Sequence, residues 1–398
     1  MTVFAPAAPS AVRFALDERI ADALLGPAEL ALRSRVRQVV AEEVQPRAAD
    51  LDRTHAFAED GYQALARAGL GGLLFPEELG GSAATTLGYA VAVEEIAAEC
   101  GATSLIFMTQ MHAAHPIMLA GTSEQKRRYV PPLCRGEAYG SLAITEPNAG
   151  SDAVSLRMTA RRDGDHYILN GSKTFITTGD RADVIICFAT VDRSAGRRGI
   201  TAFILDGNLE GLSRGRPFDK MGMHGSSTAE LFLDDVRIPV GSRLGDEGAG
   251  WTVTLSSVVK SRISAASQGV GLAAGALSYA LSALRTSGPL DEDAAFAVAG
   301  LRTELLQARL LLYATAIASD REDGPTPGEI GMMKLACTDL GSRLAYELTG
   351  LLGVRGDLAD SVVERYVRDS RVTRIYDGTN EVQRLLIARD TARRTGTA

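Results

Sequence analysis

The chain has 398 residues, 45% of them hydrophobic and 23% charged, which is the composition of a globular protein. This length predicts roughly two or three domains and a sizeable core. The formal net charge of −7 disfavours nucleic acid as a partner, and no apolar run approaches the length of a membrane span. Residues 1–10 carry two prolines and no basic segment, so they make a poor signal peptide. We expect residues 1–27 to form a flexible extension.

Cysteine and histidine residues give no metal pattern. The four cysteines lie far apart, without disulfide or metal-ligand spacing, and are predicted to be buried thiols of a cytoplasmic protein. They are Cys100, Cys134, Cys187 and Cys337. The five histidines form no cluster with cysteines or carboxylates, and the pair His112 and His115 is expected to lie on one helix face. We predict no metal site.

The order of apolar patterns predicts an α+β fold in three regions. Residues 28–135 are predicted to form an N-terminal helical domain, because apolar residues recur at helical spacing over 30–40 and 87–97. A turn-rich break at 75–81 separates these two patterns. Strands and helices do not alternate along the chain, and the sequence has no Rossmann fingerprint.

The middle region, residues 136–248, is predicted to be a β domain. Runs at 184–188, 201–205 and 229–232 have the composition of strands. Asn170-Gly171, between two apolar runs, is the strongest short hairpin signal, so we expect two strands to meet at this turn.

The last region, residues 249–398, is predicted to be helical again. A long amphipathic helix begins near Leu255, and two more cover 301–312 and 335–348. Residues 374–384 then form a polar turn that opens another amphipathic helix.

This late turn places a lone carboxylate, Asp377, just before a helix start. Gly378 permits a tight backbone turn, and Asn380 and Gln383 have the spacing of a capping box. An acid at this position can simply favour the positive end of the helix dipole. Its alternative role, as a functional carboxylate, depends on the rest of the chain.

A second segment of interest lies in the β region. Residues 142–152 form a predicted strand that runs into a loop, and the small residues at 149–151 expose amides that can approach a flat or anionic ligand. Residues 175–179 can supply an aromatic face and a hydroxyl group. Each piece alone fits an ordinary surface loop equally well.

Taken together, four motifs occur in a fixed order. They are Thr-Glu-Pro-x-Ala-Gly-Ser-Asp from Thr145, Asn-Gly-x-Lys-x-x-Ile-Thr from Asn170, Lys-Met-Gly-x-x-Gly-Ser-Ser-Thr from Lys220, and the Asp377 turn. With this combination the chain resembles the acyl-CoA dehydrogenase flavoprotein superfamily over roughly residues 28–392. The resemblance implies an N-terminal helical domain, a middle β-barrel domain and a C-terminal four-helix bundle, assembled into a homotetramer or a homodimer.

The resemblance also implies FAD as cofactor and α,β-dehydrogenation of an acyl thioester, carried by CoA or by an acyl carrier protein. In the family a carboxylate removes the α-hydrogen as a proton, flavin N5 accepts the β-hydride, and the electrons pass to an electron-transferring flavoprotein. Oxygen is the other acceptor to consider. The α-carbon is a poor acid, so hydrogen-bond donors must stabilise the developing enolate. The implied cofactor contacts are Leu142, Ile144, Thr145, Ser151, Phe175, Thr177, Arg285, Arg355 and Thr379.

By the same resemblance Asp377 is the catalytic base and Arg262 lies beside it, either tuning the base or pairing with an acid in the core. The implied substrate contacts are Ser151, Met108, Met111, Leu255, Arg262, Tyr376, Gly378 and Arg384. The family normally has Glu at the base position, so Asp377 has about 1.5 Å less reach. Some members place the base immediately before the arginine, but that residue here is Ser261.

A second departure concerns the cofactor. Family members usually carry Arg-x-x-Phe-Gly between the first two helices of the C-terminal domain, where it contacts the FAD pyrophosphate of a neighbouring subunit. Here residues 284–293 are acidic and lack the phenylalanine. Arg285 can reach a phosphate or cap its own helix. Arg355, in the glycine-rich loop 352–356, is either a replacement cation or a solvated arginine.

Two other functions stay open. One is a flavin oxidase or monooxygenase on a small non-thioester substrate, like the nitroalkane oxidases, which use Asp at the base position. The other is a catalytically silent subunit of a hetero-oligomer, although the retained Thr145, Ser151, Thr177 and Asp377 argue against it. For a thioester dehydrogenase, the shorter base leaves room for a branched, α-substituted or polar acyl group. Altered motifs of this kind are common in carrier-protein members of secondary metabolism.

Overall fold

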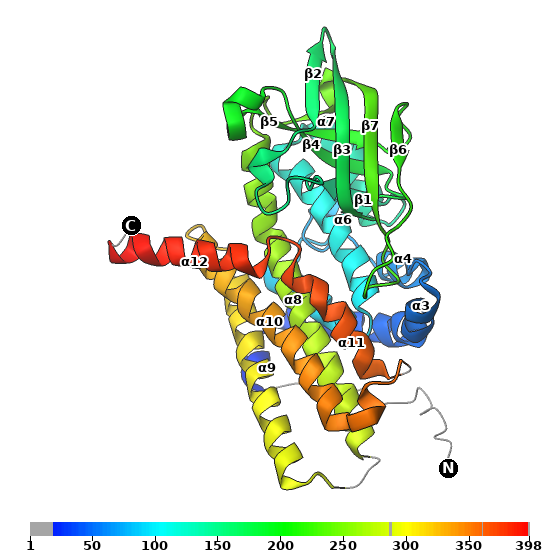
Figure 1. Ribbon diagram of the computed structural model, residues 1–398, viewed down its shortest axis with the longest axis vertical. Helices are drawn as coiled ribbons and strands as arrows, with labels where there is room; N and C mark the ends of the chain where they lie inside the picture. Colours follow the sequence, from blue (N-terminus) through cyan, green and yellow to red (C-terminus); the bar gives the residue numbers. More distant parts are fainter. Residues whose placement is uncertain (1–18, 286–288, 360, 397–398) are drawn as a thin grey trace.

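The computed structural model describes residues 19–285, 289–359 and 361–396. The β domain lies at one end of the long axis and the helices fill the rest of the molecule (Figure 1). Residues 1–18 lie outside the described residues. The predicted extension to residue 27 is wrong for its last part, because Asp22 forms an ion pair of 2.7 Å with Arg33 and Leu25 is buried. These contacts join the segment to the helical domain.

The N-terminal part is helical, as predicted. The apolar patterns at 30–40 and 87–97 form helices α2 and α5, and the break at 75–81 holds a short 3₁₀ turn that ends at Gly80 with φ of +84°. The elements are α1 (Arg19–Asp22), α2 (Pro27–Val39), η1 (Val40–Val44), η2 (Gln45–Arg47), α3 (Ala48–Thr54), α4 (Glu59–Arg67), η3 (Glu77–Leu79), α5 (Thr86–Ala97), α6 (Gly101–Ala120) and α7 (Ser123–Cys134).

Helices α5 and α6 form the centre of this part. Every residue of α5 is buried; most are apolar, and its two acids, Glu94 and Glu95, form ion pairs with Arg309 and Arg37. His112 and His115 both lie in α6, three residues apart and therefore on one face, as predicted. Burial, together with the charges of Lys260 and His112, lowers the pKa of His115 to about 4.

The predicted β domain is confirmed, but its closure into a barrel is wrong. The strands are β1 (Gly140–Ala143), β2 (Thr159–Asp163), β3 (His166–Thr177), β4 (Val184–Thr190), β5 (Ile200–Asp206), β6 (Leu212–Arg214), β7 (Thr228–Pro239) and β8 (Arg243–Leu244). They form an open sheet in the order β6-β7-β3-β2-β4-β5-β8, with β1 parallel to β4. A closed barrel needs a ladder between the two edges, and the edge strands β6 and β8 are only three and two residues long. Short turns η4 (Ala153–Ser155), η5 (Arg193–Gly199) and η6 (Val240–Ser242) complete the domain.

The predicted hairpin at Asn170-Gly171 is also wrong. Strand β3 runs through both residues, and the pairing with β7 shifts register between Leu169 and Gly171, where Gly171 has φ of +142°. The Asn-Gly pair therefore makes a β-bulge inside a strand instead of a turn between two strands. The turn that joins β2 and β3 lies at Gly164, with φ of +62°.

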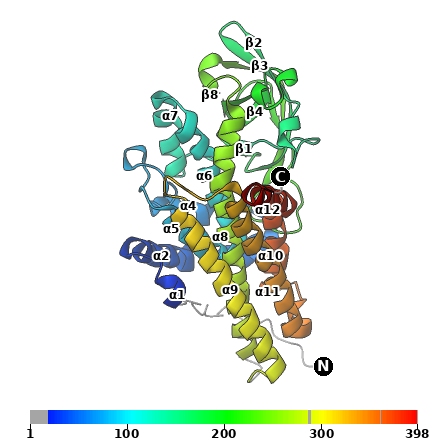
Figure 2. The ribbon, with the colours of Figure 1, turned by 90° about the vertical axis from the view of Figure 1, so that its left-hand side faces the viewer.

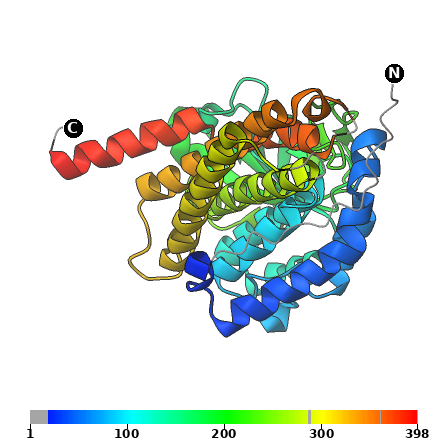
Figure 3. The same ribbon diagram turned by 90° about the horizontal axis from the view of Figure 1, so that it is seen from below.

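The C-terminal part is helical, as predicted. Its elements are α8 (Gly250–Arg285), α9 (Glu292–Ala318), α10 (Pro327–Leu352), η7 (Gly353–Gly356), α11 (Val362–Ser370), η8 (Arg371–Arg374) and α12 (Asn380–Thr395). Helices α8 to α11 pack together, whereas α12 projects from the bundle (Figures 1 and 3). None of the helices among the described residues has the length and apolar character needed to cross a bilayer.

Helix α8 connects the two helical parts, because it packs on α5 and α6 on one side and on α10 on the other (Figure 2). Glycines allow this close packing. A Cβ atom at Gly271 would lie 2.3 Å from the Glu94 carbonyl oxygen of α5, and one at Gly269 would lie 2.8 Å from the Cys337 carbonyl oxygen of α10. The backbone of α8 thus touches both neighbours, which fixes the position of any side chain it carries towards them.

Candidate active site

An ion pair in the core of the β domain holds the Thr145 loop in place. Lys173 Nζ lies 2.7 Å from Glu146 Oε1 and donates to the Ile144 carbonyl at 3.0 Å, and both side chains are almost completely buried. Glu146 also accepts from the backbone amides of Arg157 and Met158, at 2.6 and 3.0 Å. The Glu of the first motif and the Lys of the second therefore act together, since each satisfies the other's buried charge.

The ends of strands β1 and β3 lie side by side next to this ion pair. Thr174 N donates to the Thr145 carbonyl at 3.0 Å, and Ser141 Oγ donates to the Thr177 carbonyl at 2.8 Å. The buried Ala143 and Ile176 alternate with side chains that keep accessible surface. These partly open side chains are the predicted cofactor contacts Leu142, Ile144, Thr145 and Thr177.

A bulge aims Phe175 outward at the end of this row. The pairing of β3 with β7 shifts register between Lys173 and Ile176, and Phe175 has φ of +56° and is 65% exposed. Its ring centroid lies 5.1 Å from that of Phe218. In the neighbouring loop, a Cβ atom at Gly150 would meet nothing within 4 Å, and Ser151 is exposed. An open row of strand ends, an aromatic face and a roomy loop fit a flat ring with a long polar tail such as FAD.

The predicted base, Asp377, lies on a rigid turn. Asp377 and Gly378 both have positive φ, at +55° and +88°. Gln383 is fully buried and donates to the carbonyl of Gly378 at 2.8 Å and to that of Asp377 at 3.5 Å. Arg262 Nε donates to the Asp377 carbonyl at 3.4 Å. Two side chains thus hold the backbone of the turn, Arg262 from α8 and Gln383 from α12.

The Asp377 carboxylate itself is left unpaired. Its Oδ2 is buried and has no hydrogen-bond partner among the described residues, and the carboxylate forms no ion pair there with Arg262. Burial lowers the pKa of Arg262, and the negative charge of Asp377 partly offsets this effect. The Arg262 side chain therefore lies near the Asp377 carboxylate, while its hydrogen bond goes to the backbone carbonyl of Asp377. An unpaired buried oxygen is a marked exception that indicates a functional group.

The start of α12 differs from the predicted capping box. The N-cap is Thr379, whose hydroxyl accepts from Val382 N at 3.3 Å. Asn380 instead accepts from Lys334 Nζ at 2.8 Å, because its buried side chain faces α10, where it also donates to Thr338. The helix entry is thus fixed by side chains that bond across the bundle.

Other predicted contacts are spread over the chain. Tyr376 lies beside the base and donates to Gln268 of α8. Arg384 pairs with Asp339 at 3.2 Å. Arg285 ends α8, 23 residues after Arg262, which is roughly 35 Å along a helix. Within one chain, Arg285 is therefore far from Asp377.

The predicted pocket wall is only partly accessible. Met108 is 0% exposed and Met111 is 3% exposed, so both of these α6 side chains lie in the hydrophobic core. Leu255 is 50% exposed on α8, and Arg355 lies in η7. Sequence reasoning missed Gln268 and Gln383, because a glutamine in a helix gives no local signal that it bonds to a distant turn.

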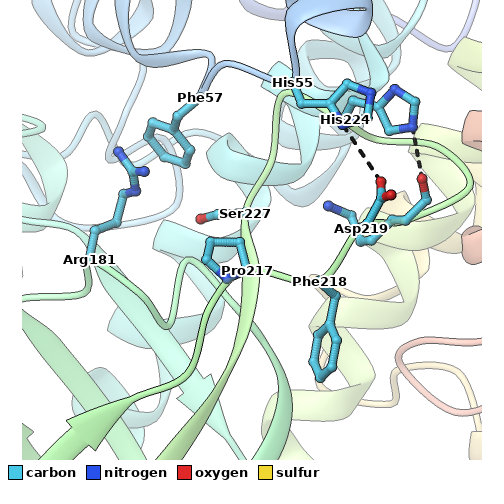
Figure 4. Close-up of a pocket in the computed structure, with 9 residues that line it drawn as sticks. His55, Phe57, Arg181, Pro217, Phe218, Asp219, His224 and Ser227 are labelled. Atoms are coloured by element: carbon cyan, nitrogen blue, oxygen red, sulfur yellow. Dashed lines mark hydrogen bonds and ion pairs between the residues drawn. The ribbon is translucent and has the colours of Figure 1, made fainter.

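A separate cavity of about 270 Å³ lies between the α3–α4 connection and the segment before β7 (Figure 4). The Arg181 guanidinium lies 3.9 Å from the Phe57 ring centroid, and the rings of His55 and His224 stack at 3.8 Å. The residues that line the cavity are His55, Phe57, Arg181, Pro217, Phe218, Asp219, Lys220, His224 and Ser227. Among the described residues, no group of three or more His, Cys, Asp or Glu side chains is placed to bind a metal ion.

The helical, β and helical parts, with an unpaired buried carboxylate and an open row of strand ends, define a flavin-dependent dehydrogenase. Family profiles of the acyl-CoA dehydrogenase N-terminal, middle and C-terminal domains match residues 26–137, 141–236 and 248–392. The chain belongs to the acyl-CoA dehydrogenase family, which confirms the resemblance seen in its motifs.

Known relatives cover nearly the whole chain. It is 35% identical over 370 residues to the short-chain specific acyl-CoA dehydrogenase of Clostridium acetobutylicum, covering 90% of this chain and 96% of that one. The butyryl-CoA dehydrogenase of Megasphaera elsdenii superposes with a TM-score of 0.88 at 32% identity, over 92% of this chain and 98% of that one. The prolyl acyl carrier protein oxidase AnaB gives 0.88 at 30% identity, over 92% and 99%.

Family membership fixes the cofactor and the reaction class. Acyl-CoA dehydrogenases bind FAD, and FAD is the cofactor of this chain. The chain is an oxidoreductase that acts on the CH–CH group of its donor.

Proposed function

We propose that this enzyme removes the α- and β-hydrogens of a short acyl thioester, with Asp377 as the base. The observation that carries the proposal is the buried, unpaired Oδ2 of Asp377 on a turn that is fixed by Gln383 and Arg262. An unpaired carboxylate oxygen held on a rigid backbone is placed to accept a proton. The short acyl chain follows the name of the Clostridium acetobutylicum relative, and the carrier is CoA or an acyl carrier protein.

The chain's own groups perform the proton transfer. Asp377 accepts the α-proton, while FAD, when bound, accepts the β-hydride. The thioester carbonyl oxygen becomes negative as the proton leaves, so it needs a donor. The Asp377 N–H has no hydrogen bond among the described residues, and we assign it this role. Arg262 acts as a positioning residue through its bond to the Asp377 carbonyl.

The remaining assignments are part of the same proposal. The row formed by Leu142, Ile144, Thr145 and Thr177 would hold the FAD ring, Phe175 would border it, and Ser151 and Thr379 would serve its polar parts. Substrate contacts are Tyr376, Gly378 and Arg384, with Leu255 around the acyl end; the other two predicted wall residues, Met108 and Met111, are buried in the core. Arg285 and Arg355 serve the cofactor of a neighbouring subunit in a homotetramer or homodimer. The enzyme works in the cytoplasm, passes electrons to an electron-transferring flavoprotein, and has domain limits near 28–135, 136–248 and 249–398.

The test is anaerobic reduction of the bound flavin by acyl thioesters, followed by its visible absorbance. Wild-type enzyme is expected to bleach rapidly, and Asp377→Asn to lose at least about a thousandfold in rate while retaining FAD. Asp323→Asn, an exposed loop residue, is the matched control. Full activity in Asp377→Asn would contradict the proposal, and a protein that cannot be loaded with FAD would revive the silent-subunit hypothesis.

Molecular oxygen is the second candidate for the acceptor that reoxidises the reduced flavin. The AnaB structure, described as a prolyl acyl carrier protein oxidase, favours it at 30% identity. An oxygen electrode separates the two acceptors: an oxidase forms hydrogen peroxide in each turnover, whereas a dehydrogenase waits for a protein acceptor. Peroxide formation without any response to thioesters would instead support a nitroalkane-oxidase-like activity.

A further inference from the structure

Three polar side chains from three helices meet beside the Asp377 turn. The hydroxyl of Tyr89 on α5 lies 2.9 Å from Ser264 Oγ on α8, and Nε2 of His112 on α6 lies 3.2 Å from the same oxygen. The neighbouring residues of α5 and α6 are buried, and most of them are apolar. Burying hydroxyl and imidazole groups among apolar helices is costly, so this polar cluster needs an explanation.

The polar cluster and the base share one face of α8. Ser264 lies one helical turn before Gln268, and Gln268 accepts a hydrogen bond from Tyr376, the residue that precedes Asp377. The negative charge of Asp377 also acts on both groups: burial and this charge raise the pKa of Tyr89, whereas burial lowers the pKa of His112 and this charge partly offsets the effect. The cluster therefore faces the same region as the carboxylate.

Two side chains in this region, His112 and Tyr376, keep accessible surface. In α6 every residue from Gly101 to Ala114 is buried except His112, which keeps accessible surface. Burial nevertheless lowers the pKa of His112, so its imidazole lies deep in the protein and is neutral near pH 7. Tyr376 is also deep and also keeps accessible surface. We infer that these two side chains border the space that the acyl group enters.

We assign the hydrogen-bond donors of the cluster from the contact between Ser264 and the Lys260 carbonyl. The Ser264 hydroxyl donates to the Lys260 carbonyl at 3.3 Å, as serine often does inside a helix. Its oxygen then accepts from Tyr89 O–H and from Nε2–H of His112. A neutral imidazole that donates from Nε2 has an acceptor at Nδ1, and Nδ1 has no partner among the described residues. In this assignment the His112 side chain presents one hydrogen-bond acceptor, Nδ1.

We propose that Tyr89, His112 and Ser264 form the distal end of the acyl pocket and select an acyl group that carries a hydrogen-bond donor, a hydroxyl or an amine, beyond the reacting carbons. This inference rests on the proposed function. A plain alkyl chain would cover His112 Nδ1 and leave it unsatisfied, whereas a donor on the acyl group would pair with it. Because Nδ1 is an acceptor, the site favours an acyl group that ends in a hydrogen-bond donor over one of similar size that ends in an acceptor.

The test uses the FAD-loaded enzyme and butyryl and pentanoyl thioesters that bear a terminal hydroxyl, methyl or methoxy group. Each is presented on CoA and on a carrier protein, and kcat/KM is measured from flavin reduction. The hydroxyl compound is expected to exceed its methyl isostere by at least about tenfold, because the methyl group leaves the acceptor unpaired. The methoxy compound, which cannot donate, is expected to show no such gain.

Variants locate the effect. His112→Leu is expected to bring the hydroxyl-to-methyl ratio to about one, and His112→Gln to restore part of it, since its amide oxygen can accept. His115→Leu, the same change one turn further along α6, is the matched control and is expected to keep the wild-type ratio.

Three results would overturn the inference. They are a wild-type ratio near one, equal rates for hydroxyl and methoxy compounds, or a ratio that falls as much in His115→Leu as in His112→Leu. In each of these cases thioesters still reduce the flavin, so the proposed function stands. If no thioester reduces the flavin, both the proposed function and this inference fail. The wild-type ratio decides the matter even if a variant does not fold.

Discussion

Replacing Gly378 by alanine tests whether the rigid turn positions the base. Gly378 has φ of +88°, and an added Cβ atom would lie 2.9 Å from Gln383 Nε2. A left-handed conformation costs an alanine about 1 kcal/mol. The Gln383 amide must also move, and a carbonyl that loses its buried partner costs about 1–3 kcal/mol more. The turn therefore bears a strain of about 2–4 kcal/mol, summed from these two terms.

Such a strain is relieved by moving the turn, since the new methyl group lies too close only to Gln383 Nε2 and reaches Arg262 and Val382 at ordinary contact distances of 3.7 and 3.8 Å. A displacement of about 1 Å at the reacting group reduces a rate about a hundredfold. We therefore expect Gly378→Ala to lower the rate of flavin reduction by about that factor, with only a small change in FAD content.

The assay is anaerobic stopped-flow reduction of the flavin, with thermal unfolding as a check on the fold. Gly300→Ala is the matched control, because Gly300 is exposed in α9 and an added Cβ atom would meet nothing within 4 Å. Reduction by Gly378→Ala within about threefold of the wild-type rate would refute the reasoning, since it would show that the turn tolerates a side chain.

The other predictions concern single contacts. Lys173→Met leaves Glu146 buried and unpaired, and should lower the free energy of unfolding in urea by about 3–5 kcal/mol. The pKa of His115 in the folded protein, about 4, lies below its value in the unfolded chain. The unfolded chain therefore binds more protons below pH 6.5, and the free energy of unfolding decreases as the pH is lowered. From pH 7 to 5 the wild type should lose about 2 kcal/mol more than His115→Leu, measured by urea unfolding. Gln383→Leu should slow flavin reduction about tenfold with little change in KM. Asp377→Glu should lower the rate of flavin reduction.

The order of the parts could be predicted from the sequence because it depends on periodicity. The apolar pattern at 87–97 repeats over several helical turns, and in the structure these residues lie in helix α5. The Asn170-Gly171 hairpin failed because the same local preference for positive φ serves a turn or a bulge, and only the pairing with β7 decides between them. The barrel failed because closure depends on the lengths of β6 and β8.

Within the site, the sequence identified the groups that act by their own chemistry. Asp377 was found from its place in an ordered motif, and its oxygen is unpaired and buried in the structure. Gln383, Gln268 and His112 act through partners far away in the chain, so their roles depend on how α6, α8 and α12 pack. No local pattern contains that information.

The shorter base of this enzyme changes how its substrate must lie. Asp377 reaches about 1.5 Å less than a glutamate would. The turn cannot make up this difference, because Gln383 and Arg262 hold its carbonyls and Gly378 accepts no side chain. The acyl group must therefore approach the turn more closely than in a relative with glutamate, which brings its far end towards His112. A glutamate at this position would occupy the space that the substrate needs, and this is why we expect Asp377→Glu to be slower than the wild type.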